Sequence, residues 1–111
     1  HALVSMIEHH LNNKITLERI VTKMCHNPAD LFQISNRGFI REGYYADLVL
    51  IDLEKSWTVN KGNILYKCNW SPFEGIKFNS SVSKTFVNGE LVYDEGIFDN
   101  KLYGKQLTFN R

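Results

Sequence analysis

The sequence predicts an α+β fold, with helices in residues 1–35 and β-strands in residues 36–111. In the first part, apolar residues recur every three or four positions, which places them on one face of a helix. Beyond Gly38 the apolar residues instead run consecutively or alternate, as they do in strands. The pair Asn88-Gly89 lies between two such runs and is a favoured turn of a β-hairpin. We therefore expect the change from helix to strand near residue 36.

The helical part contains three predicted helices. The first covers residues 3–11, and the second begins after Thr16, whose hydroxyl suits an N-cap. We expect Asn27 to cap the third, with Pro28 at its first position, where a missing N–H costs nothing. This third helix is short and should end before Asn36.

The longest strand is predicted at residues 46–53, where an almost unbroken apolar run is bounded by glycines and charges. Such a short, β-branched run is typical of a buried strand. Gly38 and Gly43 allow φ > 0 and should bracket a tight turn before it. We expect the Asp47 carboxylate to accept backbone N–H bonds at a turn and fix the start of the strand. A short strand or extended arm follows at residues 57–59.

The rest of the chain predicts a hairpin, a long loop and an extended tail. Strands at residues 82–87 and 90–93 flank the Asn-Gly turn, and residues 97–98 form one more short strand. Residues 60–81 show little periodicity. A loop of that length usually indicates function, a packed extended segment or contact with another region. The tail, residues 102–111, should be extended.

Composition argues against several classes of partner. The chain has 13 basic and 12 acidic residues, a formal net charge of +1 and no basic stripe, so nothing indicates nucleic acid binding. No apolar run approaches the ~20 residues of a membrane span, and no signal-peptide pattern is present. Because the chain begins at His1, already inside a helical pattern, we expect it to be the C-terminal piece of a longer protein. Cys25 and Cys68 form no C-x-x-C motif, which favours reduced thiols in a cytoplasmic protein over a disulfide or metal site.

Four histidines suggest a metal site, but their spacing does not support one. They are His1, His9, His10 and His26. They form neither H-x-H nor H-E-x-x-H, and two neighbours on a helix point about 100° apart. We interpret the adjacent pair as exposed and His26 as a hydrogen-bonding residue at a helix junction. For His1 we favour a structural role.

Other candidate side chains also favour structural roles. Asp47 and Asp52 resemble paired carboxylates, but no acid–base partner or nucleophile accompanies them. Ser71 lacks the G-x-S-x-G elbow and an evident base. We interpret the apolar residues around it (Trp70, Pro72 and Phe73) as a plug that packs the long loop onto neighbouring structure, with a lip near a substrate as the alternative.

Four segments, in order, resemble a known family. They are residues 27–32 (NPADLF), 38–53 (GFIREGYYADLVLIDL), 67–75 (KCNWSPFEG) and 82–93 (VSKTFVNGELVY). The chain resembles enzymes of the amidohydrolase superfamily, and within it the group of dihydroorotases, allantoinases and hydantoinases. Dihydroorotases are the members that it resembles most. The four segments cover most of the chain from Asn27 onward.

This resemblance implies a more specific fold. Residues 1–35 would be the last helices of a (β/α)8, or TIM, barrel, and residues 36–111 the C-terminal strands of its small β-sandwich domain. The full-length protein would hold zinc through an H-x-H pair, a carboxylated lysine and two further histidines, with an aspartate as acid/base. The sequence contains none of these motifs. We therefore assign no catalytic or metal-binding residue to this segment and expect no zinc in it.

The resemblance also implies a function for the full-length protein: the interconversion of N-carbamoyl-L-aspartate and dihydroorotate in pyrimidine biosynthesis. The segment alone would be inactive. The alternatives are a sister enzyme, an allantoinase or dihydropyrimidinase, and a non-catalytic scaffold or oligomerisation domain. The expected partners are the missing N-terminal part of the same protein and further copies of the chain, because open sheet edges and apolar faces promote association.

Overall fold

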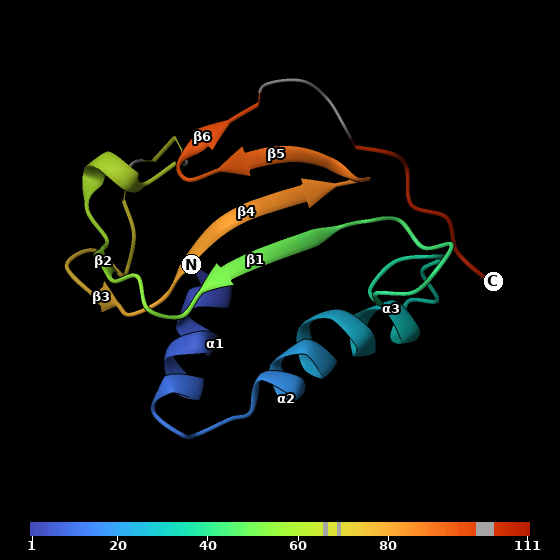
Figure 1. Cartoon of the computed structure of the whole chain (residues 1–111), viewed down its shortest axis with the longest axis horizontal. Helices are drawn as coiled ribbons and strands as arrows, with labels where there is room; N and C mark the ends of the chain where they lie inside the picture. Colours follow the sequence, from blue (N-terminus) through green and yellow to red (C-terminus); the bar gives the residue numbers. More distant parts are fainter. Residues whose placement is uncertain (66, 69, 100–103) are drawn as a thin grey trace.

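The computed structural model describes residues 1–65, 67–68, 70–99 and 104–111 (Figure 1). Its elements are α1 (Ala2–Leu11), α2 (Leu17–Val21), the π-helix η1 (Thr22–His26), α3 (Asn27–Leu31), β1 (Leu48–Asp52), β2 (Trp57–Thr58), the 3₁₀ helix η2 (Lys61–Asn63), β3 (Lys77–Phe78), β4 (Ser81–Val87), β5 (Glu90–Asp94) and β6 (Ile97–Phe98). The predicted order, longer helices first and strands after them, is confirmed. The division into two domains at residue 35 stays a prediction. No helix in the described part of the chain is both long and apolar enough to cross a membrane.

The first two helices form where the sequence predicts them. Val4 and Ile7 lie on one face of α1 and are buried. Thr16 caps α2, since its hydroxyl oxygen accepts a hydrogen bond from the backbone N–H of Arg19 at 3.2 Å. One turn further, Ile20 is only 3% exposed.

The prediction that Asn27 caps a separate helix is wrong. The backbone of His26 is already helical (φ −69°, ψ −55°), and α2, η1 and α3 form one continuous helical segment. Pro28 has no N–H, and its ring would clash with the carbonyl of Met24 in a regular α-helix. The segment accommodates it by widening into a π-turn, in which the Asn27 N–H donates to the Thr22 carbonyl five residues back.

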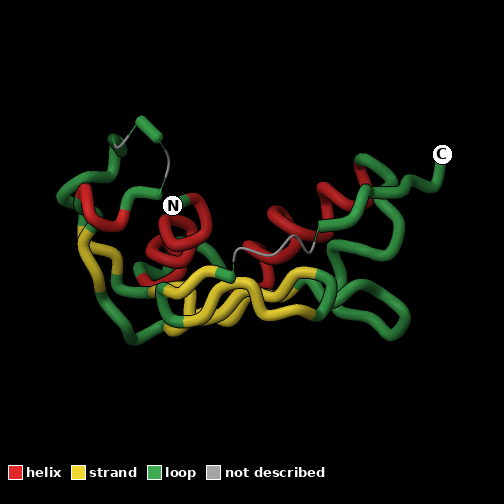
Figure 2. The backbone as a smooth tube through the Cα atoms, turned by 90° about the horizontal axis from the view of Figure 1, so that it is seen from above, coloured by secondary structure: helices red, strands yellow, loops and turns green. Residues whose placement is uncertain are grey.

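The strands form an antiparallel sheet in the order β1-β4-β5-β6, and Figure 1 shows these strands side by side. The hairpin between β4 and β5 is confirmed: Asn88 and Gly89 have φ of 51° and 83°, and a type I′ turn needs positive values at both positions. The predicted short strand at Ile97–Phe98 is β6. The helices lie to one side of this sheet (Figure 2).

The prediction of a buried strand is wrong for this structure. Strand β1 lies at the edge of the sheet, and its apolar residues Val49 and Leu50 are 45% and 48% exposed. Neighbouring residues of a strand point to opposite faces, so both faces of the sheet are open at β1. An apolar run predicts that the side chains of a strand will be buried, but other segments have to pack on them to bury them.

The long segment 60–81 contains structure that the sequence analysis missed. Strand β3 pairs with β2 in a second, two-stranded sheet, and Asn60 is the N-cap of η2. The Asn60 side chain accepts a hydrogen bond from a backbone N–H of η2, and the Asn63 side chain accepts one from the backbone N–H of Asn60. This reciprocal arrangement is a capping box, which two polar residues three positions apart can indicate in a sequence. Residues 66 and 69 of this segment lie outside the described part.

The hydrophobic core lies where this segment meets α1. Four buried residues form it: Val4, Val59, Ile64 and Phe78. Trp57, Phe73 and Val82 pack against the cluster from its margin. Of the three interpretations of the long loop, packing is therefore the one that the described residues support.

The tail returns to the end of the helical part. Phe109 forms an antiparallel bridge with Ile34, and the Ser35 N–H donates to the Thr108 carbonyl at 2.8 Å. The predicted extended conformation is confirmed for these residues of the tail, whereas residues 102 and 103 lie outside the described part. Figure 1 accordingly shows the C-terminus beside α3.

Candidate functional site

Two of the predicted candidate residues, His1 and Ser71, meet in the structure. The His1 ring lies 5.8 Å from the rings of Trp57 and Phe73 and 6.5 Å from that of Phe78, measured between centroids. Its Nδ1 atom is 3.4 Å from the Ser71 hydroxyl oxygen. The start of α1 is thereby fixed to the long segment through an aromatic cluster.

The Ser71 hydroxyl stabilises a turn of the long segment. Ser71 is 2% exposed, and its hydroxyl oxygen accepts the backbone N–H of Phe73 at 3.1 Å. A nucleophile needs an accessible oxygen and a base oriented by a third group. The hydroxyl here is enclosed and already used by the backbone, so the predicted structural role of Ser71 is supported.

The apolar residues around Ser71 behave differently from one another. Phe73 packs against the core, but Trp70 is 62% exposed and Pro72 is exposed as well. The packing of Trp70 against a barrel stays a prediction.

A second cluster, which we call the Arg37–Asp47 clamp, joins the loop before β1 to the β4–β5 turn. One carboxylate oxygen of Asp47 accepts a bond from Arg37, and the other accepts the backbone N–H of Asn88 at 2.9 Å. Arg37 Nη1 also donates to the Asn88 side-chain oxygen at 3.0 Å. The Gly89 N–H donates to the Ala46 carbonyl at 3.0 Å, so three hydrogen bonds hold the turn to the loop, and the Arg37–Asp47 contact fixes the loop itself.

The prediction that Asp47 accepts a backbone N–H is confirmed, but the donor is not in its own turn. Asn88 lies 41 residues further along the chain, so the bond fixes the pairing of β1 with the hairpin. The role of Arg37 was missed, because the sequence gives no sign of which carboxylate it meets. Its side chain is 11% exposed and stacks over the Tyr45 ring at 4.1 Å.

The two aspartates flanking β1 are not a pair. They lie at opposite ends of a five-residue strand, which separates them by roughly 16 Å. Asp52 accepts the backbone N–H of Glu54 at 2.9 Å and closes a local turn. Each aspartate therefore has a structural partner of its own.

The histidines and cysteines do not converge. His10 Nδ1 is 2.9 Å from the Ile15 carbonyl oxygen, and the His26 ring stacks on Phe39 at 4.2 Å. Cys25 and Cys68 are both exposed free thiols. Within the ranges that the structure describes, no three His, Cys, Asp or Glu side chains lie close enough together to bind a metal ion. A catalytic zinc needs about three protein ligands, so these residues do not fit one.

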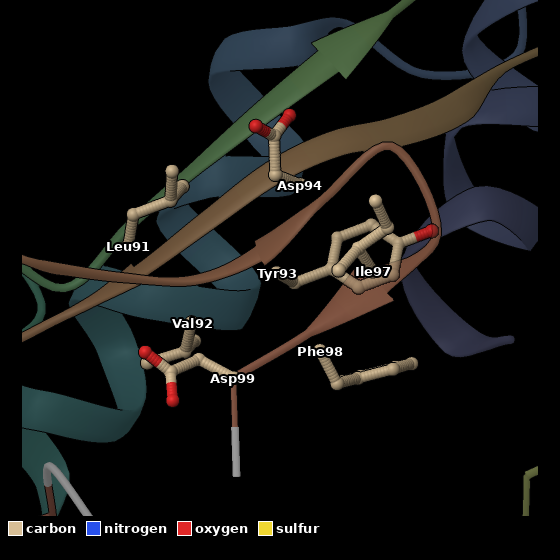
Figure 3. A pocket seen from close by; sticks show the side chains of 7 residues that line it. All are labelled: Leu91, Val92, Tyr93, Asp94, Ile97, Phe98 and Asp99. Atoms are coloured by element: carbon tan, nitrogen blue, oxygen red, sulfur yellow. The ribbon is translucent and has the colours of Figure 1, made fainter. Parts of the chain in front are cut away.

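An open groove lies at the other edge of the sheet, between β5 and β6 (Figure 3). Its walls include the rings of Tyr93 and Phe98, whose centroids are 4.9 Å apart. The carboxylate of Asp94 is 2.6 Å from Lys84 Nζ and is thus already paired. The groove is mainly apolar and lacks the set of converging polar groups that marks a catalytic site.

Two glutamates have pKa values below their ordinary range. Hydrogen bonds from the backbone and side chain of Asn79 lower the pKa of Glu8, and bonds from Ser83 and Lys55 lower that of Glu95. Both shifts stabilise the carboxylate form. A general acid would need the opposite shift at neutral pH, so neither group is suited to that role.

Comparisons with known proteins identify the family of this chain. The model of the amidohydrolase family matches residues 2–92. A dihydroorotase from Pyrococcus horikoshii is 42% identical over 94 residues, which are 85% of this chain and 22% of that protein. An allantoinase from Desulfitobacterium hafniense is 32% identical over 96 residues, covering 86% of this chain and 21% of that protein. The chain thus spans about a fifth of the length of these relatives.

The solved structures agree with this result. The L-hydantoinase (dihydropyrimidinase) from Arthrobacter aurescens matches 93% of this chain with a TM-score of 0.82 and 30% identity, over 24% of its own length. An inactive dihydroorotase-like domain of Chaetomium thermophilum matches 93% of this chain with a TM-score of 0.70, over 27% of its own length. At 18% identity it shows the fold alone. The resemblance read from the four sequence segments is thereby confirmed. The chain belongs to the amidohydrolase family.

Proposed function

We propose that the chain is the C-terminal part of a dihydroorotase, which interconverts N-carbamoyl-L-aspartate and dihydroorotate in pyrimidine biosynthesis. The observation that carries this proposal is the identity to dihydroorotases, which exceeds the identity to allantoinases over a similar length. We place the protein in the cytoplasm and assign it zinc, which residues outside this chain would bind.

In this proposal the chain supports the active site without contributing to it. Residues 1–35 would be the last helices that cover a TIM barrel, and residues 36–111 would form the C-terminal strands of a β-sandwich domain. The continuous helix supports this placement, since its residues Val21, Met24 and Leu31 are 42%, 39% and 76% exposed, and Phe32, its C-cap residue, is 53% exposed. Apolar side chains lined up along a helix are normally covered, and barrel strands would cover them.

A second candidate is a hydantoinase or dihydropyrimidinase. The likeness to the Arthrobacter aurescens enzyme favours it, because that structure matches nearly the whole chain. The two candidates share a fold and a reaction type and differ in the cyclic amide that is opened. Fold cannot decide between them, since substrate choice depends on the residues of the site.

The test is a comparison of substrates on the full-length protein. Catalytic efficiency would be measured with dihydroorotate, allantoin and dihydrouracil under identical conditions, with the metal content determined on the same sample. The proposal expects dihydroorotate to be turned over with the highest efficiency. Preference for dihydrouracil would favour the second candidate. A folded, metal-loaded protein that is inactive on all three would favour the scaffold role.

A further inference from the structure

The β4–β5 turn combines a chemically reactive dipeptide with several restraints. Asn88-Gly89 is the one Asn-Gly pair in the sequence. In such a pair the glycine nitrogen can attack the carboxamide carbon of the asparagine, because glycine has no Cβ to hinder the approach. A Cβ placed on Gly89 would meet nothing within 4 Å, so the turn is open to solvent on that side.

The reaction needs only water as a co-reactant. The Gly89 nitrogen gives up its proton and bonds to Cγ of Asn88, while the Cγ–Nδ2 bond breaks and ammonia leaves. Water then opens the five-membered imide at either carbonyl. The products are an aspartate at this position or an isoaspartate, in which the main chain continues through the side-chain carbon.

The folded chain restrains both reacting groups. The Gly89 N–H donates to the Ala46 carbonyl at 3.0 Å, so a deprotonated nitrogen would face the lone pairs of that oxygen. The Asn88 side-chain oxygen is held by Arg37 at 3.0 Å, and its backbone N–H by Asp47 at 2.9 Å. Turning the carboxamide toward the Gly89 nitrogen would break the Arg37 contact.

We propose that Asn88 is a deamidation site which the Arg37–Asp47 clamp and Ala46 hold in check, so that it reacts only when the turn opens. Opening of the hairpin tip removes all these contacts together, as local unfolding does in other proteins. The product adds a second carboxylate next to Asp47, and isoaspartate lengthens a two-residue turn whose geometry sets the register of β4 and β5. Modification therefore weakens the attachment of β1 to the hairpin.

The experiment follows ammonia loss at Asn88 in the full-length protein by peptide mass spectrometry, with chromatography to separate aspartate from isoaspartate. Wild-type protein is incubated folded and in denaturant, next to the folded variants Asp47→Ala and Lys84→Ala. The second variant is the matched control, because it removes an ion pair to Asp94 in the same hairpin without touching the turn.

We expect the folded wild type to react at least about tenfold more slowly than the denatured protein. We expect Asp47→Ala to raise the folded rate about tenfold, the change in local opening that a lost charged hydrogen bond produces. Lys84→Ala should stay near the wild-type rate. Equal rates in folded and denatured wild type would overturn the proposal even if the Asp47 variant did not fold. So would a folded Asp47→Ala protein that reacts no faster than Lys84→Ala.

Discussion

The carboxylate of Glu8 holds Asn79 with both of its oxygens. Oε1 accepts the backbone N–H of Asn79 at 2.9 Å, and Oε2 accepts its side-chain amide at 2.8 Å. Glu8 lies in the middle of α1, whereas Asn79 lies between β3 and β4, so 71 residues separate the partners. This contact joins the first helix to the point where the two sheets meet.

Replacing Glu8 by Gln should lower the free energy of unfolding by about 1 kcal/mol, since the bonds to Asn79 lose their charge in a partly solvated place. The bonds from Asn79 lower the pKa of Glu8 in the folded state. The stabilisation is therefore present above the ordinary glutamate pKa and lost as the pH falls through the lowered value. Denaturant unfolding of wild type and variant should differ near pH 7 and converge in acid. Glu42→Gln, at an exposed loop position, is the control.

Gly38→Ala should destabilise the protein more than Gly43→Ala. Both glycines have positive φ, 86° and 83°, so both variants carry the same backbone strain. A Cβ on Gly38 would also come within 2.4 Å of the Ala29 side chain and 2.8 Å of the Cys25 carbonyl, whereas one on Gly43 meets nothing within 4 Å. The extra cost should be about 1–3 kcal/mol. Thermal unfolding of the two variants measures it, and equal melting temperatures would refute the close approach.

Gly89→Val should destabilise the β4–β5 hairpin by roughly 1–3 kcal/mol, because valine strongly resists the φ of 83° found there. A Cβ at this position would meet nothing within 4 Å, so the expected cost comes from the backbone conformation. Gly89→Asn is the matched control and should cost less, since asparagine tolerates this conformation. Unfolding midpoints would be compared, and a valine variant as stable as wild type would contradict the turn assignment.

Residues 1–111 in isolation should self-associate. Val21, Met24 and Leu31 expose apolar surface along the continuous helix, Phe32 does so at its C-cap, and β1 presents an open edge. Exposed apolar faces and unpaired edges favour association by helix or strand exchange. Sedimentation should show the apparent mass rising with concentration. A stable monomer over the whole range would count against this prediction.

The parts of the fold that local sequence determines could be predicted. Thr16 caps a helix through its own hydroxyl, and Asn88-Gly89 makes a turn from its own backbone, so each can be recognised within a few residues. The π-turn before Pro28 could not, because the sequence shows that proline disturbs a helix but not whether the helix breaks or widens. Strand β3 was missed since its two residues gain their order from pairing with β2.

The contacts that matter most for the candidate site connect distant segments. Arg37 and Asp47 reach Asn88 only because β1 pairs with the hairpin, and no periodicity in the sequence indicates these contacts. The enclosure of Ser71 next to His1 likewise depends on how the long segment folds back onto α1. For Ser71 and His1 a structural role was predicted because catalytic motifs are missing from the sequence. The structure gives the physical reason for Ser71, whose hydroxyl is enclosed and accepts a backbone N–H.

We propose that this chain belongs to a cyclic amidohydrolase whose hydrolytic centre lies in other parts of the protein. This proposal is tested by measuring zinc stoichiometry and dihydroorotate hydrolysis on residues 1–111 and on the full-length protein, side by side. We expect stoichiometric zinc and turnover for the full-length protein and neither for the fragment, because the described residues offer no set of three ligands. Tight stoichiometric zinc with turnover by residues 1–111 alone would contradict it.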